Sequence, residues 1–86
     1  MNRAKRIYQI AKEYHEKELN CDCLCFLPSD VHYALQYLER YGIIPQDVEG
    51  TEVVTPWGRF GNMAWEHFLE SFNHALKEYY KYSDLP

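Results

Sequence analysis

The sequence has no apolar stretch of the roughly 18–20 residues that a membrane-spanning helix needs. Its basic start, Met1 to Arg6, is not followed by the uninterrupted apolar segment of a signal peptide. These two absences argue against a transmembrane segment and against secretion. We therefore expect a cytoplasmic protein that does not act at a membrane.

Cysteine is scarce, and the three cysteines, Cys21, Cys23 and Cys25, are crowded into one short segment. An odd number leaves at least one thiol unpaired, which fits a reducing compartment better than a disulfide framework. In an extended chain the three side chains would face one way, and an imidazole would complete a four-ligand zinc site. Structural zinc sites usually place two or more residues between paired cysteines, whereas these pairs are separated by a single residue. We predict no metal and no other cofactor, and keep this triplet as the metal candidate.

Catalytic signatures are also missing. The sequence contains no G-x-S-x-G elbow, no H-E-x-x-H pair and no phosphate-binding glycine loop. His67, Glu70 and His74 share one face of a predicted helix, but we interpret that face as the solvent-exposed side. A small core also leaves little room for a pocket of about 300 Å³. We expect a protein that is not an enzyme.

Basic residues are few and unevenly placed. Arg3, Lys5, Arg6 and Lys12 lie in the first twelve residues, where no acidic residue occurs. The residues after the first twelve contain the other five basic residues and all thirteen acidic ones, so this part of the chain has a charge of −8. The net charge of the whole chain is −4. Such an acidic body repels nucleic acid unless the basic start overrides it.

What the chain does contain is apolar and aromatic material for one small core. Of its 86 residues, 47% are hydrophobic and 16% aromatic, which predicts a single globular domain over 1–86. Apolar residues at helical spacing predict helices over 3–19, 30–41 and 63–82. β-Branched alternation and a Pro-Trp-Gly turn predict a small hairpin over 51–60. The predicted class is α+β, dominated by helix, with the hairpin between the second and third helices.

Several residues predict where these elements start and stop. Asn20 is a suitable stop for the first helix, Ser29 a suitable N-cap for the second, and Gly42 the residue expected just past its end. Residues 45–48 begin with a proline and predict one isolated turn. Because a lone hairpin is marginally stable, we expect it to pack on the helices or to recruit the cysteine segment as a third strand.

The most informative pattern is a row of three tyrosines, Tyr33, Tyr37 and Tyr41, spaced four residues apart on the second helix. They lie beside the apolar stripe of that helix, with Arg40 next to them. Tyrosine and arginine are enriched at interaction hot spots because they bury a large area while satisfying their polar ends. We predict these four residues as a partner-binding site; the alternative is that the rings form a lid over the small core.

Together these features favour a small acidic protein that acts by binding another protein, as inhibitors, immunity proteins and adaptors do. A mobile-element or phage-type accessory protein that inhibits a basic, nucleic-acid-binding host protein would suit the acidic body. Self-association through the same tyrosines is compatible with the pattern.

Two other functions stay open. The element order resembles that of a winged-helix domain, which would imply a nucleic-acid-binding regulator using the basic start. The second helix, however, offers Arg40 as its only fixed positive charge and the hairpin offers Arg59, so we do not expect a nucleic-acid partner. The other alternative is a metal-binding domain built on the cysteine triplet.

Overall fold

A computed structural model describes residues 2–19 and 27–83. The elements follow the order α1 (Arg3–Lys17), α2 (Pro28–Tyr41), β1 (Asp47–Glu49), β2 (Glu52–Thr55), β3 (Gly58–Gly61) and α3 (Asn62–Ser83). The predicted α+β, helix-dominated fold is confirmed. The cysteine triplet and Asn20 lie outside the described residues. None of the helices found in the described ranges is both long and apolar enough to cross a bilayer.

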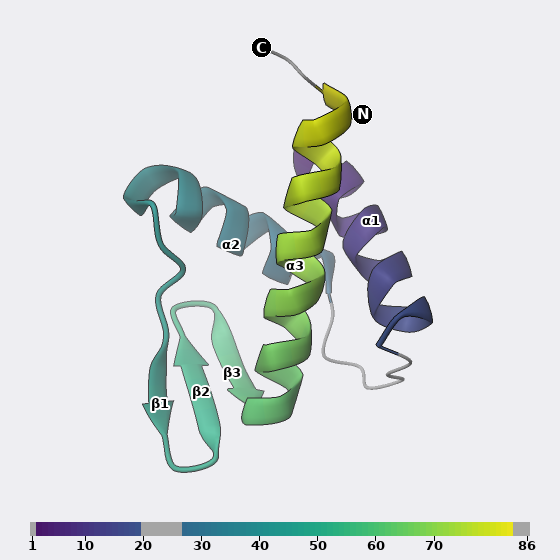
Figure 1. The fold of residues 1–86 in the computed structure, drawn as a ribbon. Coiled ribbons are helices and arrows are strands. Elements are labelled where there is room, and N and C mark those ends of the chain that lie inside the picture. The colour runs from purple at the N-terminus through teal and green to yellow at the C-terminus, as the bar shows by residue number, and fades with distance from the viewer. Residues whose placement is uncertain (1, 20–26, 84–86) are drawn as a thin grey trace.

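The helices surround one core, and the sheet extends it at one end. Figure 1 shows α1 and α3 side by side, α2 crossing them, and the sheet beside the first half of α3. In this arrangement the β2–β3 turn comes to lie facing α2 (Figure 1).

Helix α1 begins at the predicted residue and ends two residues earlier than predicted. The Asn2 side chain caps its start by accepting the backbone N–H of Lys5 at 2.8 Å. Ile7, Ala11 and His15 repeat every four residues and are all buried. The inner face of α1 is therefore apolar except for one histidine.

Helix α2 begins at Pro28, and the prediction that Ser29 caps it is wrong. Leu27 is the extended residue before the helix, and its backbone N–H donates to Asp30 Oδ2 at 3.2 Å. Proline suits the first helical position because that position has no intrahelical partner for an N–H. The prediction for the other end is confirmed, since Gly42 adopts the left-handed conformation at φ +78°.

The three strands form an antiparallel sheet in the order β1-β2-β3. Strands β2 and β3 are the predicted hairpin, but the isolated turn predicted at 45–48 is wrong, because β1 starts inside it and pairs with β2. Strand β1 therefore supplies the third strand of the described sheet, and the cysteine segment expected in that place lies outside the described residues. β1 has only three residues, Asp47–Glu49, which is too short for polar–apolar alternation to indicate a strand in the sequence.

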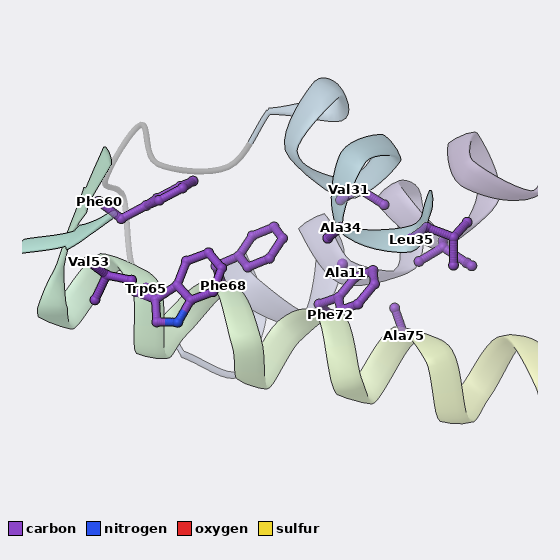
Figure 2. Packing of buried hydrophobic residues seen from close by; sticks show 11 residues of the cluster. Ala11, Val31, Ala34, Leu35, Val53, Phe60, Trp65, Phe68, Phe72 and Ala75 are labelled. Atoms are coloured by element: carbon purple, nitrogen blue, oxygen red, sulfur yellow. The ribbon is translucent and has the colours of Figure 1, made fainter. Parts of the chain in front are cut away.

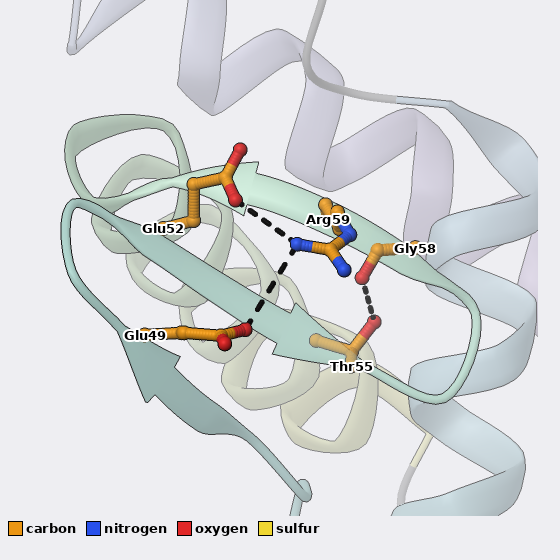
Figure 3. Close-up of polar contacts among 5 residues, drawn as sticks. All are labelled: Glu49, Glu52, Thr55, Gly58 and Arg59. Carbon is orange, nitrogen blue, oxygen red and sulfur yellow. Dashed lines mark hydrogen bonds and ion pairs between the residues drawn. The ribbon is translucent and has the colours of Figure 1, made fainter.

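Polar contacts hold the sheet and its turns in place (Figure 3). The Arg59 guanidinium on β3 lies 3.1 Å from a carboxylate oxygen of Glu52 on β2 and 4.0 Å from one of Glu49 on β1. These ion pairs link the three strands on their exposed face. Thr55 Oγ1 donates to the Gly58 carbonyl at 2.9 Å and accepts the Trp57 N–H at 3.3 Å. These two hydrogen bonds of Thr55 hold the tight β2–β3 turn in its conformation.

The core is a row of aromatic rings along α3 (Figure 2). Trp65 and Phe68 stack at 5.2 Å between ring centroids, and Phe68 and Phe72 at 5.6 Å. Phe60 from β3 packs on Trp65 at 5.0 Å, which joins the sheet to the helices. The Trp65 indole N–H also donates to the Gln46 side chain, just before β1.

The face of α3 that carries His67, Glu70 and His74 packs partly against α1, so its interpretation as the solvent-exposed side holds for Glu70, which is exposed, but not for the two half-buried histidines. Tyr14 on α1 donates to Glu70 Oε2 at 2.9 Å and stacks on His74 at 4.1 Å between ring centroids. His15 meets His67 edge to face at 6.0 Å. These residues form a polar seam between α1 and α3.

Candidate functional site

The outer side of α2 carries the three predicted tyrosines, hereafter the groove tyrosines Tyr33, Tyr37 and Tyr41. Four-residue spacing places them one above another on the helix, while Val31, Ala34 and Leu35 face the core and are buried. Tyr33 is 48% exposed and Tyr41 57% exposed, and Tyr37 is half-buried. The core therefore does not enclose these rings.

The β2–β3 turn brings a fourth ring against them. The ring centroid of Trp57 lies 6.3 Å from that of Tyr33, with the two ring planes 19° apart. It lies 6.4 Å from the ring centroid of Tyr37. On its other side Trp57 contacts the core ring of Trp65 at 6.4 Å. Its indole N–H is covered and meets no hydrogen-bond acceptor within 2–19 and 27–83. Trp57 thus joins the surface rings to the core.

Between α2 and the turn lies a groove of about 720 Å³, hereafter the α2–turn groove. One wall is formed by the groove tyrosines with Gln36, Glu39 and Arg40, and the other by Pro56 and Trp57. The expectation that this small protein leaves no room for a pocket of about 300 Å³ is wrong. The hollow forms at the surface between a helix and a turn, so it does not depend on the size of the core.

The two charged residues of the groove differ in what they contact. Glu39 forms an ion pair with Arg3 at the start of α1, and Arg3 also donates to the Tyr80 hydroxyl at 3.3 Å. Arg40 has no ion pair or hydrogen bond to any residue in the described parts of the chain. The groove therefore presents an uncompensated guanidinium on a protein whose net charge is −4.

The structure places all four residues predicted for partner binding on this groove. Sequence reading missed the residues of the opposite wall, although the Pro56-Trp57-Gly58 turn was visible in the sequence. Only the tertiary fold shows that this turn reaches the tyrosine face of α2. A large ring at the tip of a tight turn is the signal that was available, since such a side chain must pack on something.

The alternative sites gain less from the fold. Arg3, at the basic start, bonds to α2 and α3, and Lys12 pairs with Glu16 at 3.3 Å. Among the residues that the structure describes, no three potential ligands come together to hold a metal ion. The cysteine candidates lie outside those residues.

Comparison with family models, with curated proteins and with solved structures finds no match for this chain.

Proposed function

We propose that this protein acts without catalysis, by binding a protein partner in the α2–turn groove. The observation that carries the proposal is the open groove in which three exposed or half-exposed tyrosines, a tryptophan and an unpaired arginine converge. These are the residue types that dominate binding energy at protein interfaces. An inhibitor or adaptor role fits a small acidic protein of this kind.

The rigidity of the groove supports the same proposal. One wall is a regular helix, and the other is a turn fixed by Thr55 and anchored through Trp57 on the core ring of Trp65. A preformed surface loses little conformational entropy on binding, so more of its contact energy is available for affinity. The acidic body would also steer a basic partner toward the protein.

The test is affinity capture from cells of the source organism, followed by binding measurements with the purified partner. Combined substitution of Tyr33, Arg40 and Tyr41 by serine should weaken partner binding at least about 100-fold, since hot-spot residues contribute about 2 kcal/mol or more each. Thermal unfolding should stay within a few degrees of wild type, because the two tyrosine rings are largely exposed.

The matched control is Met63→Ser, which removes an exposed large side chain (70%) from the first turn of α3, outside the residues that line the groove. It should leave partner binding unchanged. If the triple variant binds as wild type does, or if it loses its fold, the groove is not the binding site. Sedimentation of the purified protein shows whether the captured partner is a second copy of this chain.

A further inference from the structure

The side chains of the α2–turn groove can donate several hydrogen bonds to a ligand, and Arg40, unlike the hydroxyls and the Gln36 amide, can only donate. The three tyrosine hydroxyls, the Gln36 amide and the Arg40 guanidinium can all donate to a ligand. The one carboxylate of the groove, on Glu39, is already paired with Arg3. A ligand that presents many hydrogen-bond acceptors and few donors of its own therefore complements this groove.

The groove also offers little backbone to a ligand. Its long wall is α2, whose backbone groups are used within the helix, and the Trp57 N–H of the turn is taken by Thr55. A ligand that adds as a β-strand needs a free strand edge, and the groove has none among its lining residues. A helical ligand lays an apolar face into its groove, whereas the row of rings here carries hydroxyls and is flanked by Gln36 and Arg40.

One peptide conformation meets these conditions. A proline-rich segment in the polyproline II conformation has few N–H donors, exposes its carbonyls and makes no internal hydrogen bonds. Its flat rings pack on aromatic side chains, which is how aromatic-lined grooves recognise such segments. Because the segment is already ordered before binding, it loses little entropy.

The dimensions agree with this ligand. The groove tyrosines span nine residues of α2, whose eight steps cover about 12 Å at 1.5 Å per residue. A polyproline II segment advances about 3.1 Å per residue, so about four residues cover the row of rings.

Building on the proposed function, we propose that the α2–turn groove binds a proline-rich segment of the partner in the polyproline II conformation, with an acidic residue of that segment paired to Arg40. The groove tyrosines and Trp57 hold the proline rings, and the tyrosine hydroxyls donate to the segment's carbonyls. The guanidinium of Arg40 selects the acidic flank because it is the groove's uncompensated charge.

The experiment is a nuclear magnetic resonance titration of the ¹⁵N-labelled protein with three synthetic octapeptides. The first has a central run of prolines with aspartate at both ends, the second has asparagine at both ends, and the third keeps the aspartates around a Gly/Ser run. We expect the first peptide to bind at least tenfold more tightly than the third. It should also bind about threefold more tightly than the second, as an exposed ion pair adds little.

Two indole signals report where the peptide binds. The Trp57 indole N–H should shift, because that ring lines the groove. The Trp65 indole N–H should shift less, because it is held by Gln46 and its ring does not line the groove. Arg40→Ala should abolish the difference between the aspartate and asparagine peptides. Tyr41→Ser should weaken both about tenfold or more, and Met63→Ser should change neither.

Equal affinity for the proline and Gly/Ser peptides, shifts confined to other surfaces, or no binding at millimolar peptide would each overturn the proline-rich ligand. If partner capture still depends on Tyr33, Arg40 and Tyr41 in those cases, the groove binds a protein by another mode and the proposed function stands. If the captured partner's contact region is mapped to a helix or a folded surface, the proline-rich ligand is likewise overturned.

Discussion

Trp57 is the residue on which the candidate site depends most. It lies in the two-residue turn between β2 and β3. Its ring contacts both Tyr33 on the surface and Trp65 in the core. The distances between ring centroids are 6.3 Å to Tyr33 and 6.4 Å to Trp65. Because one ring contacts both layers, the position of the groove wall is coupled to the packing of the core.

His15 is the residue through which we expect pH to act on stability. Burial lowers the pKa of its imidazole below the ordinary value of 6.5, and the neighbouring His67 lowers it further, against a smaller opposite effect of Glu16. The unfolded chain then binds more protons than the folded one at pH values just below 6.5. The contribution of His15 is therefore fully present above pH 6.5 and declines as the pH falls below it.

We expect the free energy of unfolding, measured by urea titration, to be lower at pH 5.5 than at pH 7.5. His15→Gln, which cannot be protonated in this range, should reduce that difference. The matched control is His32→Gln, which removes an exposed histidine from α2 and should leave the difference unchanged. An unaltered pH dependence in His15→Gln would show that protonation of this imidazole is not opposed by the fold.

At the scale of elements, α2 serves two layers at once. Its inner side supplies Val31, Ala34 and Leu35 to the core, and its outer side supplies the groove tyrosines. An insertion or deletion of one residue within α2 would therefore rotate the side chains that follow it by about 100° relative to those before it, and would disrupt both rows. The two ends of α2 are held by Asp30 and by the left-handed Gly42.

Substitutions at the start of α2 test whether Asp30, as in the structure, or Ser29, as predicted from the sequence, stabilises the first turn of the helix. Asp30→Ala removes the acceptor of the Leu27 N–H and should cost about 1 kcal/mol, or about 4–8 °C in Tm. Ser29→Ala, the cap predicted from sequence, should cost less than about 0.5 kcal/mol because Ser29 is exposed inside the first turn.

Asp30→Asn should lie close to wild type at pH 7, because the amide keeps an acceptor oxygen and avoids placing a charge in a buried site. Burial raises the pKa of the Asp30 carboxyl, which shows that its charged form is disfavoured there. A larger loss from Ser29→Ala than from Asp30→Ala, measured by thermal unfolding, would contradict this account of the helix start.

At the scale of the whole molecule, charge decides which partners are compatible with the groove. The residues after the first twelve carry a balance of −8, and Arg3 bonds to Glu39 and Tyr80 within the protein. Few cations are therefore left to contact phosphates. Binding of nucleic acid depends on such contacts and weakens steeply with salt.

We expect no salt-dependent binding to duplex DNA in fluorescence anisotropy at low ionic strength. Joint substitution of Arg3, Lys5 and Arg6 by alanine should leave the flat binding curve unchanged. Binding that falls steeply with salt and is lost in this variant would favour the nucleic-acid-binding regulator over the protein-binding module.

Much of the fold was predictable because the strong signals are local. The three helices follow from apolar spacing, the end of α2 from Gly42, and the hairpin from β-branched residues and a turn. Strand β1 was not predictable, because three residues are too few for a periodic signal and they gain their structure by pairing with β2. The polar seam between α1 and α3 was missed because a histidine–carboxylate face resembles a solvent-exposed one until a neighbour packs on it.

By itself, the sequence determined the class of fold and the four residues of α2 that face away from its core stripe, since periodicity alone sets which side of a helix a residue occupies. The tertiary structure alone decided that these residues form one wall of a groove. The opposite wall comes from Pro56 and Trp57, and the neutralisation of Glu39 comes from Arg3 on another helix. Contacts between segments so distant in the chain arise from packing, which leaves no periodic trace in the sequence.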